Sequence, residues 1–535
     1  IGSFYPLLSG LLNESNENLE IINDIKNFIS NFVDTDDIII LLIITLFSLF
    51  FIKLIFQFFL ILWETNYIKD INVYLSKRLI NGYLNLDFKN YLSQNSSVRI
   101  RNFNFAIESY VGALKAIIVL ISEFITVSAL IILMLVVNFE MTILTLTILF
   151  FPVLLIFFSY RKFFKKISKF LAENMSSALK HLMQALNSYK EIKIFNKEFI
   201  FIKNYLNHQK KVIYLNRRSE ILQSSIKILF DLMTILIFIS LLVYSKLNYG
   251  NFSANLSFLG MIMLVFLRVI PSISKILRSL NKLQKNKNLI LELVNDLEKQ
   301  ENVVENEKNI LTINFDNSIE LKSIFFNYKE KIIFRNANLK IIKGKSIGIC
   351  GDLGSGKTTI IDILMGYHKP DLGEILIDKK EVIINNKFWK KKLGYVPQMV
   401  NLLDDNIESN ISLETNDEDI NKEKIKKLTK NLDIKIGNIN EKNLLGEDGS
   451  KISGGQRQKI GIARALYLDP KILILDEATN SMDKDNEEKV LNYIMSYDKN
   501  ITNIIISHDL NVLKKCDQIY LLKDFKFELM DKTNN

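Results

Sequence analysis

The chain has 535 residues, of which 48% are hydrophobic, and a formal net charge of +10. At roughly 100–200 residues per domain, this length predicts at least two domains. An excess of Lys and Arg is compatible with nucleic-acid binding, but the long apolar runs of the first half favour basic cytoplasmic loops of a membrane protein, with no nucleic-acid partner. The cysteines are Cys350 and Cys516, which argues against a disulfide framework and for a reduced, cytoplasmic second half.

Residues 1–37 lie ahead of the first long apolar run and are mainly acidic. Their charged side chains are Glu14, Glu17, Glu20, Asp24, Lys26, Asp34, Asp36 and Asp37. Because basic rather than acidic loops are retained in the cytoplasm, residues 13–36 are expected to form an external segment. No charged n-region with a cleavage site precedes the apolar runs, so a signal peptide is not expected.

Long apolar runs follow at about residues 38–63, 114–137, 141–158, 228–244 and 256–276. A helix of about 20 residues, at 1.5 Å per residue, spans a bilayer core of about 30 Å. The last two runs, taken alone, could be buried helices of a soluble core, but the presence of five such runs in one chain favours membrane spans. We therefore expect an all-α transmembrane domain over residues 1–285.

Loop charge predicts the side of the membrane that each loop faces. The stretches 69–115 and 161–218 are rich in Lys and Arg, so both are expected in the cytoplasm. The turns at Asn138 and around Asn251 are then external, and the last run returns the chain to the cytoplasm. This alternation needs one earlier membrane helix, so we expect a six-helix domain whose first helix is truncated, with residues 1–12 as its outer end.

The second half is expected to comprise a linker, residues 286–310, and a soluble α/β domain, residues 311–535. A buried strand, Ser346–Cys350, precedes a glycine-rich loop, and a helix, Thr359–Met365, follows it. The loop and the start of the helix read Gly351, Asp352, Leu353, Gly354, Ser355, Gly356, Lys357, Thr358 and Thr359, which fits G-x-x-x-x-G-K-[ST].

This motif predicts a phosphate-binding loop. Its glycines let backbone N–H groups surround the phosphates, and the helix N-terminus favours negative charge. Lys357 is expected to reach the β- and γ-phosphates of ATP, and the Thr358 hydroxyl to bind Mg²⁺. The alternative for this motif alone is a chance glycine-rich turn.

A second motif supports the first. Residues 472–475 read as an apolar strand, which ends in Asp476 and Glu477. Asp476 is expected to hold Mg²⁺ through water and Glu477 to polarise the water that attacks the phosphate, because in-line phosphoryl transfer needs charge neutralisation and an oriented nucleophile. By itself an apolar strand that ends in acids is an ordinary feature.

The stretch Ile452-Ser453-Gly454-Gly455-Gln456 lies between these motifs and resembles the L-S-G-G-Q signature of the ATP-binding cassette superfamily, with Ile452 in the place of Leu. Further stretches occur in the order of that superfamily. They are Tyr328 in Phe326–Tyr328, Gln398 in Tyr395–Gln398, Gly446–Gly449, Asp483 in Asn480–Asp483, and His508 in Ile506–His508.

The resemblance implies a role for each of these residues. Tyr328 would stack on adenine, Gln398 would sense Mg²⁺, and His508 would contact the γ-phosphate. Asp483 would lie in the D-loop. Residues 453–456 of one cassette would complete the ATP site of another, so the chain would act as a homodimer. Without this context, Tyr328 would be an ordinary strand aromatic and His508 a structural histidine; His181, His208 and His368 have no motif context and are expected at the surface or in packing.

A membrane domain ahead of a cassette resembles the exporters of this superfamily. Residues 185–198 resemble the second coupling region of exporters, and residues 88–95 are expected to form the first. The resemblance implies an ATPase that is coupled to transmembrane transport, in a half-transporter of the bacterial inner membrane that crosses it several times and has its cassette in the cytoplasm. A soluble cassette ATPase that acts on nucleic acid is disfavoured by the apolar runs, and an ATP-gated channel by the intact Glu477 and His508.

Ionisable side chains within membrane spans are costly and therefore functional candidates. Within or near the apolar runs they are Lys53, Lys115, Glu123, Lys227, Asp231 and Arg268. The alternative for Lys115 and Lys227 is that they extend toward the cytoplasmic surface. We expect Lys53, Lys227 and Arg268 to line a path for an anionic substrate, with Arg268 suited to phosphate and Pro271 opening the local helix.

The stretch Arg268–Ser272, the external segment and the overall layout resemble bacterial lipid-linked oligosaccharide flippases. The resemblance implies a polyprenyl-pyrophosphate-linked oligosaccharide as the substrate. The alternative is a peptide, multidrug or lipid exporter of the same family.

Overall fold

The structure is a computed structural model. It describes residues 38–137, 139–249, 256–305, 314–328, 331–382, 387–414, 416, 418–434, 445–446 and 449–530. The described residues form two compact units: 38–86 with 91–303, and 87–90 with 304–530. The external segment, the turns at 138 and 250–255, the end of the linker and the pair 447–448 lie outside the described residues.

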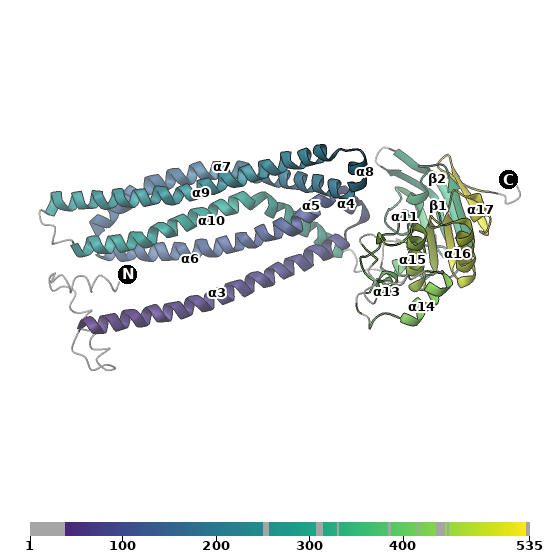
Figure 1. The fold of residues 1–535 in the computed structure, drawn as a ribbon, viewed down its shortest axis with the longest axis horizontal. Coiled ribbons are helices and arrows are strands. Elements are labelled where there is room, and N and C mark those ends of the chain that lie inside the picture. The colour runs from purple at the N-terminus through teal and green to yellow at the C-terminus, as the bar shows by residue number, and fades with distance from the viewer. Residues whose placement is uncertain are drawn as a thin grey trace. The chain divides into compact units, whose positions relative to one another are not determined.

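The first unit is helical (Figure 1). Its long helices are α3 (Ile38–Leu84), α6 (Ile107–Val137), α7 (Phe139–Asn187), α9 (Glu198–Tyr249) and α10 (Leu256–Glu305). Shorter helices are α4 (Phe88–Ser93), which begins in the second unit, α5 (Ser96–Arg101), the π-helix η1 (Asn102–Ala106) and α8 (Tyr189–Ile194). The long helices contain the five apolar runs, and α10 continues as a helix through Pro271.

The long helices extend beyond the apolar runs, and there they bury a core of their own. Leu79 of α3, Ile107 of α6, Ala172 of α7 and Leu293 of α10 belong to one buried cluster. Helices α7 and α9 run side by side (Figure 1). The extension follows from amphipathic helical patterns outside the apolar runs, in which one face is apolar and packs inward.

Within the apolar runs, many large side chains are exposed in the chain taken alone. Along α3 they include Phe51, Leu54, Phe58 and Trp63, each more than half exposed. Lipid solvates apolar side chains, and a helix satisfies its own backbone hydrogen bonds, so such a surface is stable in a bilayer. By length and composition, three helical stretches of the described chain could cross a membrane: Phe47–Leu84, Ser96–Val136 and Glu198–Ser240.

The second unit contains two sheets. The first has the strand order β2-β1-β4-β5 and is antiparallel; its strands are β1 (Ser318–Tyr328), β2 (Lys331–Ile342), β4 (Leu372–Ile377) and β5 (Lys380–Glu381). The second has the order β10-β9-β3-β8-β7-β6. Its strands are β3 (Ser346–Gly351), β6 (Leu393–Val396), β7 (Ile472–Asp476), β8 (Thr502–Ile506), β9 (Gln518–Lys523) and β10 (Lys526–Leu529).

All neighbouring strands of the second sheet are parallel except β9 and β10. The helices of this unit are α11 (Lys357–Leu364), α12 (Lys387–Lys390), α13 (Ile407–Ser412), α14 (Lys422–Asn431), α15 (Gly454–Tyr467), α16 (Lys484–Tyr497) and α17 (Leu510–Leu513). Every residue of β7 and β8 is buried, as expected for parallel strands covered on both faces. The fold class expected from the sequence, a helical domain followed by an α/β domain, is confirmed.

The strand order determines where the site forms. Strands β3, β8 and β7 are adjacent and parallel, so their carboxyl ends meet at one edge of the sheet. The glycine-rich loop follows β3, Asp476 ends β7, and His508 lies two residues beyond β8. Ligands of open α/β sheets bind at this edge.

Candidate functional site: the ATP-binding edge of the cassette

The glycine-rich loop connects β3 to α11 and depends on its glycines. Gly356 has φ +110°, and a Cβ there would lie 2.5 Å from Cγ2 of Ile333. A Cβ on Gly351 would lie 2.6 Å from the carbonyl oxygen of Leu522 on β9. The loop therefore approaches its neighbours more closely than any side chain would permit.

Lys357 is the first residue of α11, and its side chain turns back over the loop. Its Nζ donates to the carbonyl oxygens of Gly351 at 2.7 Å and Asp352 at 2.9 Å, and the residue is 7% exposed. A buried ammonium held by two neutral carbonyls carries charge that an anion can offset. Among the described residues, Ser355 Oγ is buried and has no hydrogen-bond partner. A phosphate that accepts from Ser355 and Lys357 fits this loop.

Asp476 lies at the end of β7 and is 5% exposed. Burial raises the pKa of its carboxyl, and the charge of Glu477 raises it further, while a hydrogen bond from Tyr395 and the charge of Lys357 oppose the rise. Burial and the charge of Asp476 also raise the pKa of Asp362, on α11, to about 6. A cation at this place would relieve the repulsion between these carboxylates, so their arrangement fits a metal ion.

The described residues include no group of three or more His, Cys, Asp or Glu side chains that could hold a metal ion. Mg²⁺ does not require one, because it retains water and commonly binds through one or two protein groups and the phosphates of its nucleotide. The predicted ligands Thr358 and Gln398 are both exposed, and Asp476 is buried. The donor set fits Mg²⁺ bound together with ATP.

Glu477 is the point on which three loops converge. Its Oε2 accepts from Gln398 Nε2 at 2.7 Å and from Asn480 Nδ2 at 3.0 Å. Its Oε1 lies 2.7 Å from His508 Nε2. The backbone of Glu477 has φ +50°, a conformation that is costly for a residue with a side chain and is common at functional sites. The carboxylate is only 13% exposed.

Tyr328 is the last residue of β1 and is 46% exposed, so its side chain is accessible for stacking. His368, which follows α11, packs against it: the ring centroids are 6.0 Å apart at 81°. The His368 ring also lies 5.2 Å from Phe326 and 5.7 Å from Phe88, one of the residues 87–90 of the second unit. His368 is thus a packing residue, as expected, but one that supports Tyr328.

The signature stretch begins α15. Ser453 caps that helix, and its Oγ accepts from the backbone N–H of Gln456 at 3.3 Å. A Cβ on Gly454 would lie 3.3 Å from Cβ of Ser481 in the D-loop, and Gly455 is similarly close to the backbone carbonyl of Ser481. The glycines therefore let the D-loop pack on the start of α15.

Asp483 ends the D-loop and directly precedes α16, without a capping hydrogen bond from its side chain. Its Oδ1 accepts from Asn486 Nδ2 at 2.5 Å, and this hydrogen bond lowers the pKa of the Asp483 carboxyl. Asp352, Leu353, Gly354, Thr358 and Thr359 complete the predicted nucleotide site; Asp352, Leu353, Gly354 and Thr358 are exposed and Thr359 is half-buried. The sequence singled out neither Asp362 nor a role for Tyr395 and Asn480, which it gave only as members of the stretches 395–398 and 480–483; their link to Asp476 and Glu477 lies in the fold.

The predicted substrate residues belong to three different helices: Lys53 to α3, Lys227 to α9 and Arg268 to α10. Lys53 is exposed, and its Nζ lies 5.4 Å from the ring centroid of Phe50. The side chain of Lys227 lies outside those described. Arg268 Nη2 lies 3.9 Å from Oε2 of Glu123, whose Oε1 accepts from Lys275 Nζ at 2.5 Å. The structure thus adds Glu123 and Lys275 as partners of Arg268.

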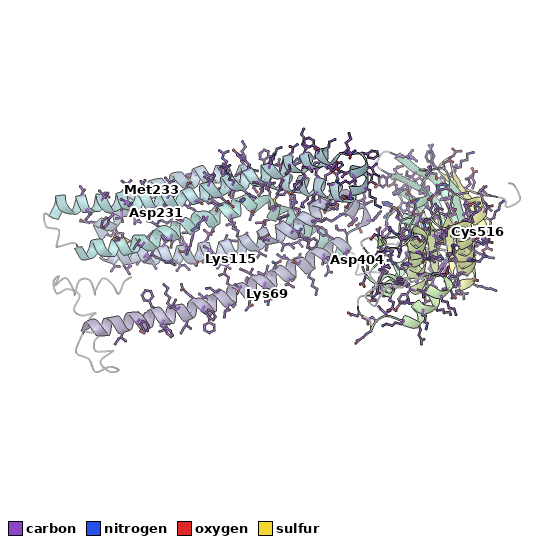
Figure 2. The ribbon with its side chains drawn as sticks, viewed as in Figure 1. Lys69, Lys115, Asp231, Met233, Asp404 and Cys516 are labelled. Atoms are coloured by element: carbon purple, nitrogen blue, oxygen red, sulfur yellow. The ribbon has the colours of Figure 1, made fainter. Side chains whose placement is uncertain are left out.

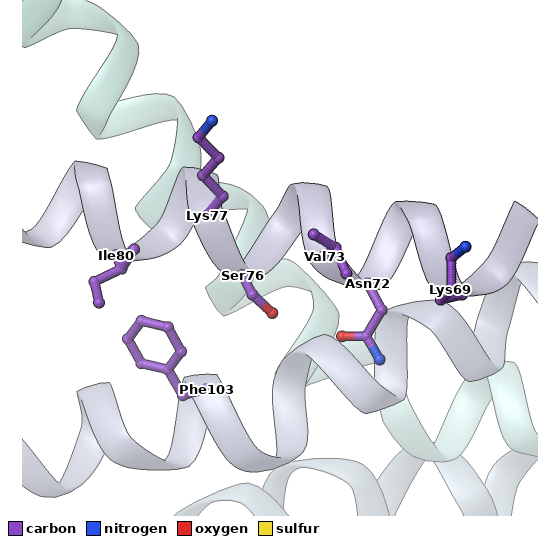
Figure 3. A pocket seen from close by; sticks show the side chains of 7 residues that line it. All are labelled: Lys69, Asn72, Val73, Ser76, Lys77, Ile80 and Phe103. Carbon is purple, nitrogen blue, oxygen red and sulfur yellow. The ribbon is translucent and has the colours of Figure 1, made fainter. Parts of the chain in front are cut away.

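Other charged side chains of this unit take no part in the cluster of Glu123, Arg268 and Lys275. Lys115 and Asp231 lie along its helices (Figure 2), and Lys115 Nζ lies 3.7 Å from Oε1 of Glu64. A pocket with a volume of about 510 Å³ lies between α3 and η1, and its lining side chains are drawn in Figure 3. It is lined by Lys69, Asn72, Val73, Ser76, Lys77, Ile80 and Phe103, none of which belongs to the predicted substrate path.

The fold and the site define a helical membrane-type domain joined to a nucleotide-binding cassette. The chain matches the ABC transporter transmembrane region over residues 18–269 and the ABC transporter cassette over residues 334–480. It belongs to the ABC transporter family.

Relatives of the chain support this assignment. A Rickettsia typhi protein, named as an export ATP-binding/permease protein, is 31% identical over 69% of this chain and 66% of its own length. A Wigglesworthia glossinidia brevipalpis protein, named as an ATP-dependent lipid A-core flippase, is 29% identical over 70% of this chain and 65% of its own length. The chain thus spans just under two thirds of these relatives.

A solved structure of a bacterial Atm1-family ABC exporter with ATP bound has the same fold. The TM-score is 0.77 and the sequence identity 19%, over 99% of this chain and 94% of that chain. At this identity the similarity concerns the fold, and the fold is that of an ABC exporter.

Proposed function

We propose that this chain is an ATP-hydrolysing exporter or lipid flippase. The observation that carries the proposal is the convergence of Gln398, Asn480 and His508 on Glu477. Glu477 directly follows buried Asp476, beside the phosphate loop. A nucleotide switch without turnover needs no oriented carboxylate, whereas hydrolysis of ATP does.

In this mechanism each residue acts at a defined atom. Lys357 Nζ and the loop N–H groups bind the phosphates, and Tyr328 stacks on the adenine. Mg²⁺, held by Thr358, Gln398 and Asp476, would neutralise phosphate charge. Glu477 orients the attacking water through a carboxylate oxygen, and His508 holds the other oxygen and contacts the γ-phosphate.

The chain works as a homodimer in this proposal. It contains one phosphate loop and one signature stretch, and residues 453–456 serve the ATP bound to the second copy. The helical domain crosses the bacterial inner membrane, and the cassette lies in the cytoplasm. The basic stretches 69–115 and 161–218 support this orientation.

An amphipathic anion is the proposed substrate, specifically a polyprenyl-pyrophosphate-linked oligosaccharide. Arg268 and Lys275 lie seven residues apart, so they share one face of α10, and both pair with Glu123 of α6. The carboxylate is 7% exposed, whereas Arg268 and Lys275 are 44% and 42% exposed. Glu123 thus holds two cations whose remaining N–H donors and excess positive charge are available to a phosphate. A peptide, multidrug or other lipid exporter is the alternative.

Transport in proteoliposomes that contain the full chain tests the function and the substrate. Glu477→Gln should abolish both ATP hydrolysis and transport. Arg268→Ala, Lys275→Ala and the double variant Lys53→Ala/Arg268→Ala should lose flipping of the pyrophosphate-linked glycan and keep basal hydrolysis. Lys69→Ala is the matched control, because the Lys69 side chain is 65% exposed and pairs with Asp70, which is itself exposed.

The outcomes separate the parts of the proposal. Transport by Glu477→Gln at the wild-type rate would contradict ATP-driven export. Full glycan flipping by the double variant would contradict the anionic path. Transport of a peptide or drug panel in place of the glycan would favour the alternative substrate class.

A further inference from the structure

The D-loop contains one more side chain that reaches Glu477. Asn480 begins the loop three residues after Glu477, and its Nδ2 donates to Glu477 Oε2 at 3.0 Å. Its backbone N–H also donates to the carbonyl oxygen of Glu477 at 3.3 Å. Residues 477–480 therefore form a tight turn in which both the backbone and the side chain of Asn480 donate to Glu477.

Gln398 and Asn480 share Oε2, while His508 contacts Oε1. An sp² carboxylate oxygen has two lone-pair directions, so the two amides fill both of those on Oε2. Gln398 is also a proposed Mg²⁺ ligand through its amide oxygen, while its amide nitrogen donates to Glu477. If Gln398 turns to the ion, Asn480 remains as the donor that orients Oε2, and a lone pair becomes free for water.

The D-loop is itself held firmly enough to position Asn480. The backbone N–H of Ser481 donates to Gln458 Oε1 of α15 at 3.2 Å, and Gln458 is 4% exposed. The backbone N–H of Met482 donates to the carbonyl oxygen of buried Thr479 at 3.0 Å. Asn480 thus lies between Thr479 and Ser481, whose backbone groups are both held by hydrogen bonds.

We propose that Asn480 is a positioning residue for hydrolysis, which holds the Glu477 carboxylate toward the attacking water. This inference rests on the proposed role of Glu477. The hydrogen bond from Asn480 to the charged carboxylate stabilises the orientation that the reaction needs. Its loss should therefore raise the activation free energy and lower kcat about 10-fold. Within the described part of the chain, the hydrogen bonds of Asn480 go to Glu477 and not to the phosphate loop, so the KM for ATP should stay within about two-fold.

The test measures steady-state ATP hydrolysis by the full chain in proteoliposomes, with kcat and KM separated. Asn480→Ala removes the side chain, and Asn480→Asp keeps its shape but replaces the donor with a charge. Both should lower kcat, and Asn480→Asp should lower it more, because two carboxylates would then face each other. ATP binding and the thermal midpoint are measured for each variant, so that loss of folding is distinguished from loss of rate.

Asn492→Ala is the control. Asn492 is exposed on α16, and its Oδ1 accepts from Lys515 at 2.9 Å, so this variant should hydrolyse at the wild-type rate. Folded Asn480→Ala and Asn480→Asp with wild-type kcat, or with a raised KM alone, would overturn the role of Asn480. Glu477→Gln with wild-type hydrolysis would instead overturn the proposed function, which separates the two failures.

Discussion

Asp362→Asn should stabilise the cassette in a pH-dependent manner. The carboxyl of Asp362 lies on α11, and burial together with the charge of Asp476 raises its pKa from 3.8 to about 6. Below pH 3.8 the group is protonated in both the folded and the unfolded chain. Between pH 3.8 and 6 the folded chain retains a proton that the unfolded chain has lost, so its stability falls as pH rises.

Above pH 6 the cost is fully present. A shift of about two pH units corresponds to about 3 kcal/mol at 1.36 kcal/mol per unit, and partial solvation of the site reduces it to roughly 1–2 kcal/mol. The neutral amide avoids this cost. Asp362→Asn should therefore raise the free energy of unfolding by roughly 1–2 kcal/mol at pH 7.5 and leave it almost unchanged near pH 4.

Fluorescence of Trp389 provides the assay. The chain has two tryptophans, and Trp63→Phe leaves Trp389, which is fully buried in the cassette, as the reporter of unfolding in the full detergent-solubilised chain. Without nucleotide, the midpoint of Asp362→Asn should rise by roughly 2–8 °C at pH 7.5. Asp404→Asn, at an exposed aspartate, is the control and should change little. A pH-independent gain, or a loss at pH 7.5, would refute the reasoning.

Three further substitutions test the packing of the site. Gly356→Ala should abolish ATP binding, measured by a fluorescent analogue, because its Cβ would meet Ile333 at 2.5 Å and φ is +110°; retained affinity would contradict this account of the loop. Trp389→Ala should destabilise the cassette by about 3–5 kcal/mol in thermal unfolding, since Trp389 is fully buried and donates to the carbonyl oxygen of Leu364 at 2.8 Å. Tyr395→Phe removes the hydrogen bond that lowers the pKa of Asp476; half-maximal hydrolysis should then require several-fold more Mg²⁺, and an unchanged requirement would count against a metal role for Asp476.

Local sequence determined much of the nucleotide site. Lys357 follows its loop glycines directly, because a phosphate loop needs one strand, one turn and one helix in succession. Asp476 and Glu477 are likewise neighbours in the chain, at the end of one strand. The apolar runs likewise predicted the long helices, since a membrane-spanning helix needs about 20 predominantly apolar residues.

Tertiary structure decided which side chains share a site. Gln398, Asn480 and His508 meet at Glu477 because parallel strands end at one edge of a sheet, and the order of those strands cannot be obtained from motif spacing. Arg268 was singled out as an ionisable residue in an apolar run. Its partner Glu123, however, lies on α6, and the second cation, Lys275, lies on α10. Lys275 and Glu123 are 152 positions apart in the chain, so only the packing of α6 against α10 brings them together. The sequence alone therefore determined the chemistry that each segment carries, while the contacts that orient it required the fold, because a side chain's partner depends on which elements pack together in space.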